Sequence, residues 1–325
     1  MDAIQFTAKC EARLVDVDEV QSPAANQAIV RTHRMGICGT DISAFHGKFP
    51  FFQFPRIPGH ELGVEVVAVG EQVDNVMPGD RCALEPYFND PESPTSKRGL
   101  TNCCTELQVF GVHCDGGLRN GTYSVPAHKL HPGNDLGFDQ LALVEPLAIG
   151  YHAVQRGAPR PGENVLVIGA GPIGLACLEF LKLHDVKLQV MDLDPARLNF
   201  CRERFEISAD DPPADLIIDA TGSAHSMSTC LEHANFGGRI VYVGVTQDEV
   251  HFAHAPIFHR RELTLIASRN ALSADFPNII QILSDGSIDL APWMTHRISL
   301  QEVPERFAEV THPDSGVIKA MIEIQ

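Results

Sequence analysis

The pattern of hydrophobic and polar residues changes near residue 145, and the change divides the chain into two kinds of region. Before it, short β-branched runs such as AIVRTHRMGI and LGVEVVAVG end at turn residues, and proline and glycine are dense through residues 47–121. Runs of this kind predict β-strands. The segment EPLAIGYHAVQRGA (residues 145–158) then shows a helical period, with a proline at a possible first helical position.

The next segment predicts strands that alternate with helices. Residues 164–193, NVLVIGAGPIGLACLEFLKLHDVKLQVMDL, contain a buried strand, a glycine turn, an amphipathic helix and a second strand that ends in an acid. Three further buried strands are predicted by ADLIIDATG, GRIVYVGV and LTLIASRN. Alternating strands and helices are typical of a parallel, doubly wound sheet.

Two parts of the pattern do not fit a full doubly wound domain. Between Asp192 and Asp215 there is room for one helix but not for a further crossover, which needs at least about 10–12 residues. The sheet is therefore predicted to be shortened. After residue 270 the chain has one helix-like segment, DFPNIIQILSDG, and a final strand pattern, VIKAMIEI, with no obvious partner in the α/β part.

Composition narrows the classes of protein and partner. The chain has 325 residues, 44% of them hydrophobic, a formal net charge of -17, and no run of Lys or Arg longer than two. Nucleic acid and anionic membranes are thus poor partners. We find no apolar run of transmembrane or signal-peptide length, so a cytoplasmic protein is expected. Nine scattered cysteines indicate reduced thiols, some of which could bind metal.

A glycine fingerprint lies between the first strand and the first helix of the α/β segment. Gly169, Gly171 and Gly174 form G-x-G-x-x-G, which predicts a dinucleotide site with the pyrophosphate at the helix N-terminus. Asp192 follows at the end of the next strand, where a carboxylate binds a ribose diol and repels a 2′-phosphate. Arg197 would weaken that preference if it reached back, but it also fits a solvated helix position. NAD is therefore the predicted cofactor.

Three candidate metal ligands lie in the β-rich part. GICGTD carries Cys38, and GHELG carries His60 and Glu61. Taken alone, each residue also fits a purely structural role, as a buried cysteine, a core histidine or a surface acid. Together, a thiolate, an imidazole and a carboxylate with an open fourth position make a catalytic zinc site.

These motifs in their order, G-I-C-G-T-D, P-G-H-E-x-x-G, E-P and G-A-G-P-I-G, resemble the zinc-dependent medium-chain dehydrogenase family over essentially the whole chain. FPFFQFPRIPGHE, TNCCTELQVFGVHCDGG and HRRELTLIASRNA are similar to its polyol and sugar-acid branch, near sorbitol, threonine and L-galactonate dehydrogenases. The resemblance implies an α/β protein in which residues 1–146 and 270–325 form a GroES-like, β-rich catalytic domain. Residues 147–269 would form the shortened Rossmann domain.

The resemblance also implies roles for individual residues. Cys38, His60 and Glu61 match the catalytic zinc ligands. Glu145 matches a fourth carboxylate that binds directly or through water, although it also fits an acid at a helix N-terminus. Thr40 matches the hydroxyl that hydrogen-bonds the substrate alcohol. The implied cofactor contacts are Gly169, Gly171, Pro172, Ile173, Gly174, Asp192, Arg197, Thr221, Val243 and Arg269. Arg269 and its neighbour Asn270 fit fold residues equally well.

The implied activity is hydride transfer from a secondary alcohol of a polyol or sugar acid, L-galactonate-like, to NAD, with one zinc polarising the alcohol. Two rival interpretations are an NADP-linked alcohol or aldehyde reductase and a non-catalytic, nucleotide-sensing relative. A homodimer or homotetramer is expected, because LTLIASRN would be an apolar sheet edge of the kind that a partner covers.

The sequence departs from the family pattern at two places. Ser43 stands where the family often has a histidine that continues the proton path from Thr40, and His46 is a possible substitute. Arg119, Asn120 and Gly121 replace an expected Glu-Tyr pair near the cleft, so substrate preference could differ.

The segment DPESPTSKRGLTNCC (residues 90–104) falls where relatives bind a structural zinc with spacing C-x2-C-x2-C-x7-C. Counting back from Cys104 by that spacing reaches Ser96, Ser93 and Asp90, which cannot close a thiolate shell. We therefore expect a metal-free lobe, with a loop over residues 88–102 that is mobile or folded differently.

Overall fold

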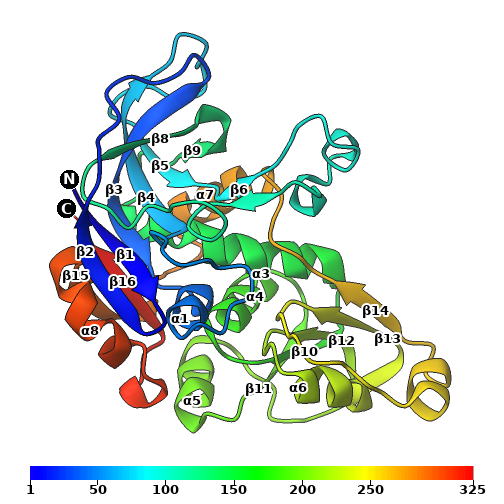
Figure 1. The fold of residues 1–325 in the computed structure, drawn as a ribbon. Coiled ribbons are helices and arrows are strands. Elements are labelled where there is room, and N and C mark those ends of the chain that lie inside the picture. Colours follow the sequence, from blue (N-terminus) through cyan, green and yellow to red (C-terminus); the bar gives the residue numbers. More distant parts are fainter. Residues whose placement is uncertain (325) are drawn as a thin grey trace. The chain divides into compact units, whose positions relative to one another are not determined.

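The computed structural model describes residues 1–324 and divides into two compact units (Figure 1). Residues 1–145 and 272–324 form one, here named the split unit, and residues 146–271 form the other, the continuous unit. The two boundaries lie within two residues of the boundaries expected from the sequence. No helix within residues 1–324 has the length and apolar character needed to cross a membrane.

A seven-stranded sheet forms the centre of the split unit, with strand order β15-β16-β3-β4-β5-β9 and with β8 also paired to β3. Its strands are β3 (Gln27–Gly36), β4 (Glu61–Val69), β5 (Arg81–Leu84), β8 (Thr122–Pro126), β9 (Leu130–Pro132), β15 (Met294–Ser299) and β16 (Lys319–Glu323). The final strand pattern of the sequence is β16, which pairs antiparallel with β3 and parallel with β15. This pairing explains why VIKAMIEI has no partner in the α/β part.

The split unit also contains two small sheets and several helices. These are β1 (Asp2–Ala8) with β2 (Glu11–Asp16), β6 (Tyr87–Phe88) with β7 (Gln108–Val109), and helices α1 (Gly39–Phe45), α2 (Phe138–Ala142), α7 (Asp275–Ser284) and α8 (Val303–Val310). An aromatic cluster joins β1 to two of the helices. The ring of Phe6 lies 5.4 Å from that of Phe45 in α1 and 5.3 Å from that of Phe307 in α8, centroid to centroid. Burial of each ring contributes about 1.5–3 kcal/mol, so the cluster anchors α1 firmly.

The continuous unit is built on a five-stranded parallel sheet of order β11-β10-β12-β13-β14. Its strands are β10 (Asn164–Ile168), β11 (Lys187–Met191), β12 (Ala214–Asp219), β13 (Ala234–Tyr242) and β14 (Thr264–Ala267). They alternate with helices α4 (Pro172–Leu181), α5 (Pro195–Arg204) and α6 (Ala224–Thr229), and α3 (Val144–Gly157) precedes them. Between β11 and β12 the described chain has α5 and no strand. The shortened parallel sheet is therefore confirmed.

Short helical turns complete the fold. They are 3₁₀ turns at Ser96–Arg98, Thr101–Cys103, Ala127–Lys129, Cys230–His233, Ala291–Trp293, Leu300–Glu302 and Pro313–Ser315, and a π-helical turn at His254–His259.

The lobe between β6 and β7 contains the 3₁₀ turns Ser96–Arg98 and Thr101–Cys103 (Figure 1). Polar side chains within it hydrogen-bond one another. The Ser93 hydroxyl donates to the Ser96 hydroxyl at 2.8 Å, and the Asn89 side-chain amide also donates to Ser96, at 2.9 Å. The Cys104 thiol is buried and lies 4.0 Å from the carbonyl oxygen of Asp90. The four positions that the zinc spacing selects, Asp90, Ser93, Ser96 and Cys104, are thus linked by hydrogen bonds.

Candidate functional site

Cys38 is positioned by the start of α1, directly after β3. Its backbone N–H donates to the Asp41 carboxylate at 3.0 Å, and its sulfur accepts from the backbone N–H of Thr40 at 3.4 Å. This reciprocal cap fixes the turn, because both orphan donors at the helix start gain a partner. The thiol therefore points from a rigid backbone.

His60 and Glu61 enter the site at the start of β4. Ligand atoms of Cys38, His60 and Glu61 all lie within 4.8 Å of one another, and within residues 1–324 this is the one group of three such residues with metal-site spacing. Nδ1 of His60 is buried without a hydrogen-bond partner and lies 3.6 Å from a carboxylate oxygen of Asp41. Because buried polar atoms are normally paired, this orphan nitrogen and the thiolate, imidazole and carboxylate donor set fit a zinc ion.

Lys319 of β16 was not anticipated as part of the site. Its Nζ lies 2.6 Å from Oε1 of Glu61 and also contacts Oε2, and both side chains are about 1% exposed. Burial by itself would lower the pKa of Lys319, but attraction to Glu61 and to Cys38 outweighs burial and raises it. Gly36 makes room for the carboxylate, since a Cβ there would lie 2.1 Å from Oε2 of Glu61. The buried ammonium of Lys319 therefore offsets the negative charge of one candidate metal ligand, Glu61.

The glycine fingerprint surrounds the start of α4 in the continuous unit. Gly169 follows β10, Gly171 caps the helix, and Pro172 and Ile173 begin it. A Cβ on Gly174 would lie 1.7 Å from the carbonyl oxygen of Gly169, so only glycine permits this close approach of helix and turn.

Asp192 directly follows β11, where its carboxylate is held against the glycine turn. One oxygen accepts from the N–H of Ala170 at 2.6 Å and the other from the N–H of Asp194 at 2.8 Å. Arg197 also lies beside the turn, since its Nη1 is 3.5 Å from the place where a Cβ of Gly171 would be. Arg197 thus lies close to the turn while its side chain stays 38% exposed.

The other predicted cofactor contacts follow strands of the same sheet. Thr221 comes after β12, and its methyl group is 3.1 Å from a Cβ built on Gly169. Val243 directly follows β13, and Arg269 comes two residues after β14. Their contacts with a cofactor remain predictions.

Comparisons with known proteins bear on this arrangement. Residues 24–135 match the alcohol dehydrogenase GroES-like domain, and residues 204–285 match a domain described as zinc-binding dehydrogenase. The chain is 36% identical over 320 residues to an L-galactonate-5-dehydrogenase of Escherichia coli strain K12, with 94% of each chain covered. It is 33% identical to a D-altritol 5-dehydrogenase of Agrobacterium fabrum, with 93% of this chain and 94% of the relative covered.

Solved structures give the same fold. An alcohol dehydrogenase (rspB) from E. coli CFT073, complexed with NADH, superimposes with a TM-score of 0.90 at 27% identity, covering 100% of this chain and 99% of the other. A zinc-binding dehydrogenase from Sinorhizobium meliloti 1021 bound to NADP superimposes equally well at 24% identity, covering 99% of each chain. The chain belongs to the zinc-dependent medium-chain dehydrogenase family, in its polyol and sugar-acid branch. It is a zinc-type alcohol oxidoreductase that acts on CH–OH groups with a nicotinamide cofactor.

Glu145, the predicted fourth carboxylate of this dehydrogenase, lies in the first turn of α3 and is buried. Among the described residues it is not a member of the three-ligand group. It accepts a short hydrogen bond from the hydroxyl of Tyr87, and burial raises its pKa to about 7. Binding of a metal by Glu145, directly or through a water, therefore remains a prediction.

The structure gives the positions of Thr40 and His46, the two residues considered for the proton path. Thr40 lies in the first turn of α1, near Cys38. His46 ends the same helix, and its Nδ1 lies 3.5 Å from the sulfur of Cys10. The continuation of the path beyond Thr40 stays open.

The segment that departs from the family pattern is tied into the fold. Arg119 donates from Nε to the carbonyl oxygen of Gly116 at 2.8 Å, and its guanidinium lies 4.9 Å from the ring centre of Tyr123. The N–H of Asn120 donates to the carbonyl oxygen of Asp2 at 2.7 Å. These contacts give Arg119 a structural role, which the sequence alone did not show.

Asp219 is a second residue that sequence reasoning missed. It ends β12, is fully buried, and accepts from the Thr221 hydroxyl at 2.7 Å and from the Ser226 hydroxyl at 2.5 Å. An acid at the end of the buried strand ADLIID was the available signal. It orders the carboxyl end of the sheet, where cofactors bind in such folds.

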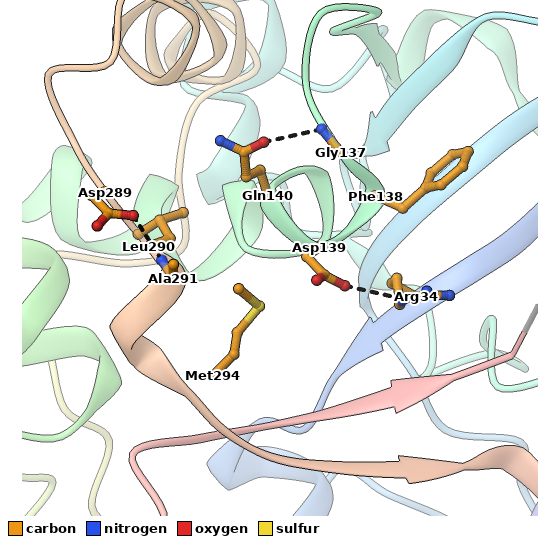
Figure 2. A pocket seen from close by; sticks show the side chains of 9 residues that line it. All are labelled: Arg34, Gly137, Phe138, Asp139, Gln140, Asp289, Leu290, Ala291 and Met294. Atoms are coloured by element: carbon orange, nitrogen blue, oxygen red, sulfur yellow. Dashed lines mark hydrogen bonds and ion pairs between the residues drawn. The ribbon is translucent and has the colours of Figure 1, made fainter.

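A separate pocket of about 340 Å³ lies in the split unit, between β3, α2 and the start of β15 (Figure 2). Its lining contains none of the predicted site residues. Its main charges are already paired, since Arg34 lies 3.0 Å and Arg297 2.6 Å from oxygens of Asp139. The pocket therefore adds nothing to the catalytic assignment.

Proposed function

We propose that this protein oxidises a secondary alcohol of a sugar acid or polyol, L-galactonate-like, to the ketone with NAD as hydride acceptor. The observation that carries the proposal is the group of half-buried Cys38 with buried His60 and Glu61. A zinc ion held there would act as a Lewis acid and lower the pKa of the substrate hydroxyl. The names of the relatives, an L-galactonate and a D-altritol 5-dehydrogenase, support the substrate class.

The remaining steps are the transfer of a proton and of a hydride from the substrate. Thr40 would accept the hydroxyl proton of the substrate and pass it toward solvent. The carbon-bound hydrogen would leave as hydride to the nicotinamide, so each turnover releases one ketone, one reduced cofactor and one proton. Ser43 stands where the family often has a histidine, so the path beyond Thr40 is not part of this proposal.

The choice of NAD rests on Asp192. Its carboxylate is anchored by two backbone N–H groups and would meet a 2′-phosphate with like charge. Arg197 favours the second candidate, an NADP-linked reductase, because it lies beside Gly171 and carries the opposite charge. We place Asp192 first because its position is fixed by the backbone, whereas Arg197 has a long side chain that also lies 3.7 Å from Asp194.

We also propose that the protein is a homodimer or homotetramer. β14 is an edge of its sheet, and its side chains are exposed or half-buried. An edge strand offers unpaired backbone groups to a second copy. Light scattering at micromolar concentration should show more than one chain per particle, and a monomer would refute this part.

The decisive experiment is a panel of aldonates, polyols, threonine and simple alcohols, each assayed with NAD and NADP by absorbance of the reduced cofactor. We expect the highest kcat/KM for an aldonate or polyol with NAD, and loss of activity after zinc removal that zinc restores. Activity confined to NADP would favour the reductase. Zinc and cofactor binding without turnover on any member would favour a non-catalytic relative.

A further inference from the structure

Glu145 poses a question for a catalytic metal site. It is a buried carboxylate, and both His60 and Glu61 act on it electrostatically. A fourth protein ligand would close a tetrahedral zinc shell, and closed shells are typical of structural sites. Among residues 1–324, Glu145 does not belong to the group whose ligand atoms lie within 4.8 Å of one another, so its contacts are of interest.

The structure offers one specific restraint. The hydroxyl of Tyr87 donates a short hydrogen bond to Oε1 of Glu145, across 58 residues of sequence. Both groups are buried, with Tyr87 3% and Glu145 5% exposed. If the carboxylate swung toward the metal, it would leave a buried hydroxyl unpaired, which is unfavourable.

Tyr87 is itself held rigidly. It lies in β6, whose partner β7 pairs Val109 with Tyr87, and its ring packs edge-on against Phe276 of α7 at 6.3 Å. Two residues before it, Glu85 is fixed by Lys129 at 2.5 Å and by His131 at 3.0 Å. The phenol therefore has little freedom to follow a moving carboxylate.

We propose that Tyr87 is a positioning residue whose hydroxyl holds the Glu145 carboxylate outside the three-ligand metal site, so that the fourth position stays open to substrate. The inference rests on the proposed zinc-dependent function. In this scheme Tyr87 acts only through Glu145, to which its hydroxyl donates.

The test uses metal retention and cobalt spectroscopy, which need no substrate. In Tyr87→Phe the ring packing is kept and the restraint is removed, so Glu145 becomes free to bind. We expect zinc loss to a chelator to slow about tenfold, the ratio that corresponds to ~1.4 kcal/mol. In the cobalt-substituted parent, added imidazole should change the visible spectrum, and in Tyr87→Phe this response should be lost.

Two further variants separate positioning from packing. Tyr87→Phe combined with Glu145→Gln should lose metal at the rate of Glu145→Gln alone and regain the imidazole response, because an amide is a poor zinc ligand. Phe276→Leu should lower thermal stability but leave both readouts at the parent values.

Unchanged metal loss and imidazole response in Tyr87→Phe would overturn the inference, as would faster metal loss. The same changes in Phe276→Leu would replace it with a packing effect. A parent protein that binds neither zinc nor cobalt would instead overturn the proposed function, and the inference with it.

Discussion

Replacing Asp192 with alanine tests whether one carboxylate sets the cofactor preference. Its two oxygens each accept one backbone hydrogen bond, from Ala170 at 2.6 Å and from Asp194 at 2.8 Å. An ionised carboxylate has about four acceptor positions, so about two remain for the two hydroxyls of an adenosine ribose. We expect the parent protein to bind NADH at least tenfold more tightly than NADPH.

The magnitude follows from the charges. A unit charge on a 2′-phosphate about 4 Å from the carboxylate is repelled by roughly 4 kcal/mol at an effective dielectric constant of 20. Asp192 is only partly buried, so salt and water screen the repulsion, and we keep about a third of it. The remaining ~1.4 kcal/mol is a factor of ten in affinity. Asp192→Ala should therefore lower the NADH-to-NADPH preference about tenfold.

Fluorescence titration gives both dissociation constants at fixed ionic strength without any substrate. Asp194→Ala is the matched control, because it removes the same charge two residues away, where the carboxylate caps α5 through Ala196 at 2.8 Å. Its preference should stay within about twofold of the parent, since exposed charges contribute little. Equal affinities in the parent, or equal changes in both variants, would refute the assignment of preference to Asp192.

Four other measurements check the remaining assignments. Cys38→Ser should abolish turnover and zinc binding but change NADH affinity less than about threefold, because the glycine fingerprint lies in the other unit; a comparable loss of NADH affinity would contradict this. Metal analysis of protein purified without chelators should give close to one zinc per chain, and a value near two that Cys104→Ser lowers to one would disprove the metal-free lobe. Gly174→Ala should weaken NADH binding tenfold or more, about 1.4 kcal/mol, because its Cβ would lie 1.7 Å from a backbone oxygen of the turn; unaltered affinity would show that the turn adapts. Lys129→Met should lower the free energy of unfolding by about 3–5 kcal/mol in urea titrations, because it strips the buried Glu85 of its cation, and a loss below about 1 kcal/mol would count against that ion pair.

The parts of the fold that the sequence predicted well are those set by local pattern. The glycine turn and Asp192 lie within one strand–helix–strand segment, so spacing alone indicated their arrangement. The metal ligands could be predicted because the ordered motifs of the family contain them. Cys38 and His60 are brought close by β3 and β4, which are antiparallel neighbours.

What the sequence did not show depends on contacts between distant residues. Lys319 meets Glu61 across 258 positions, and Tyr87 meets Glu145 across 58. The hydrophobic periodicity within one segment gives no information about such long-range pairs. The lobe was expected to be mobile or folded differently, and composition could not show that the Ser93 and Ser96 hydroxyls would hydrogen-bond each other, because that depends on side-chain orientation.

The split unit takes its residues from both sides of the continuous unit, and this has a consequence for synthesis. Chains grow at roughly 5–20 residues per second, so Lys319 leaves the ribosome roughly 13–50 s after Glu61, from which it is separated by 258 positions. In the last part of that interval, after residue 271 has been made, residues 146–271 are complete and can fold as a unit, whereas β3 still lacks its partner β16. The newborn chain thus has a finished dinucleotide unit while the Glu61 carboxylate is still without its lysine.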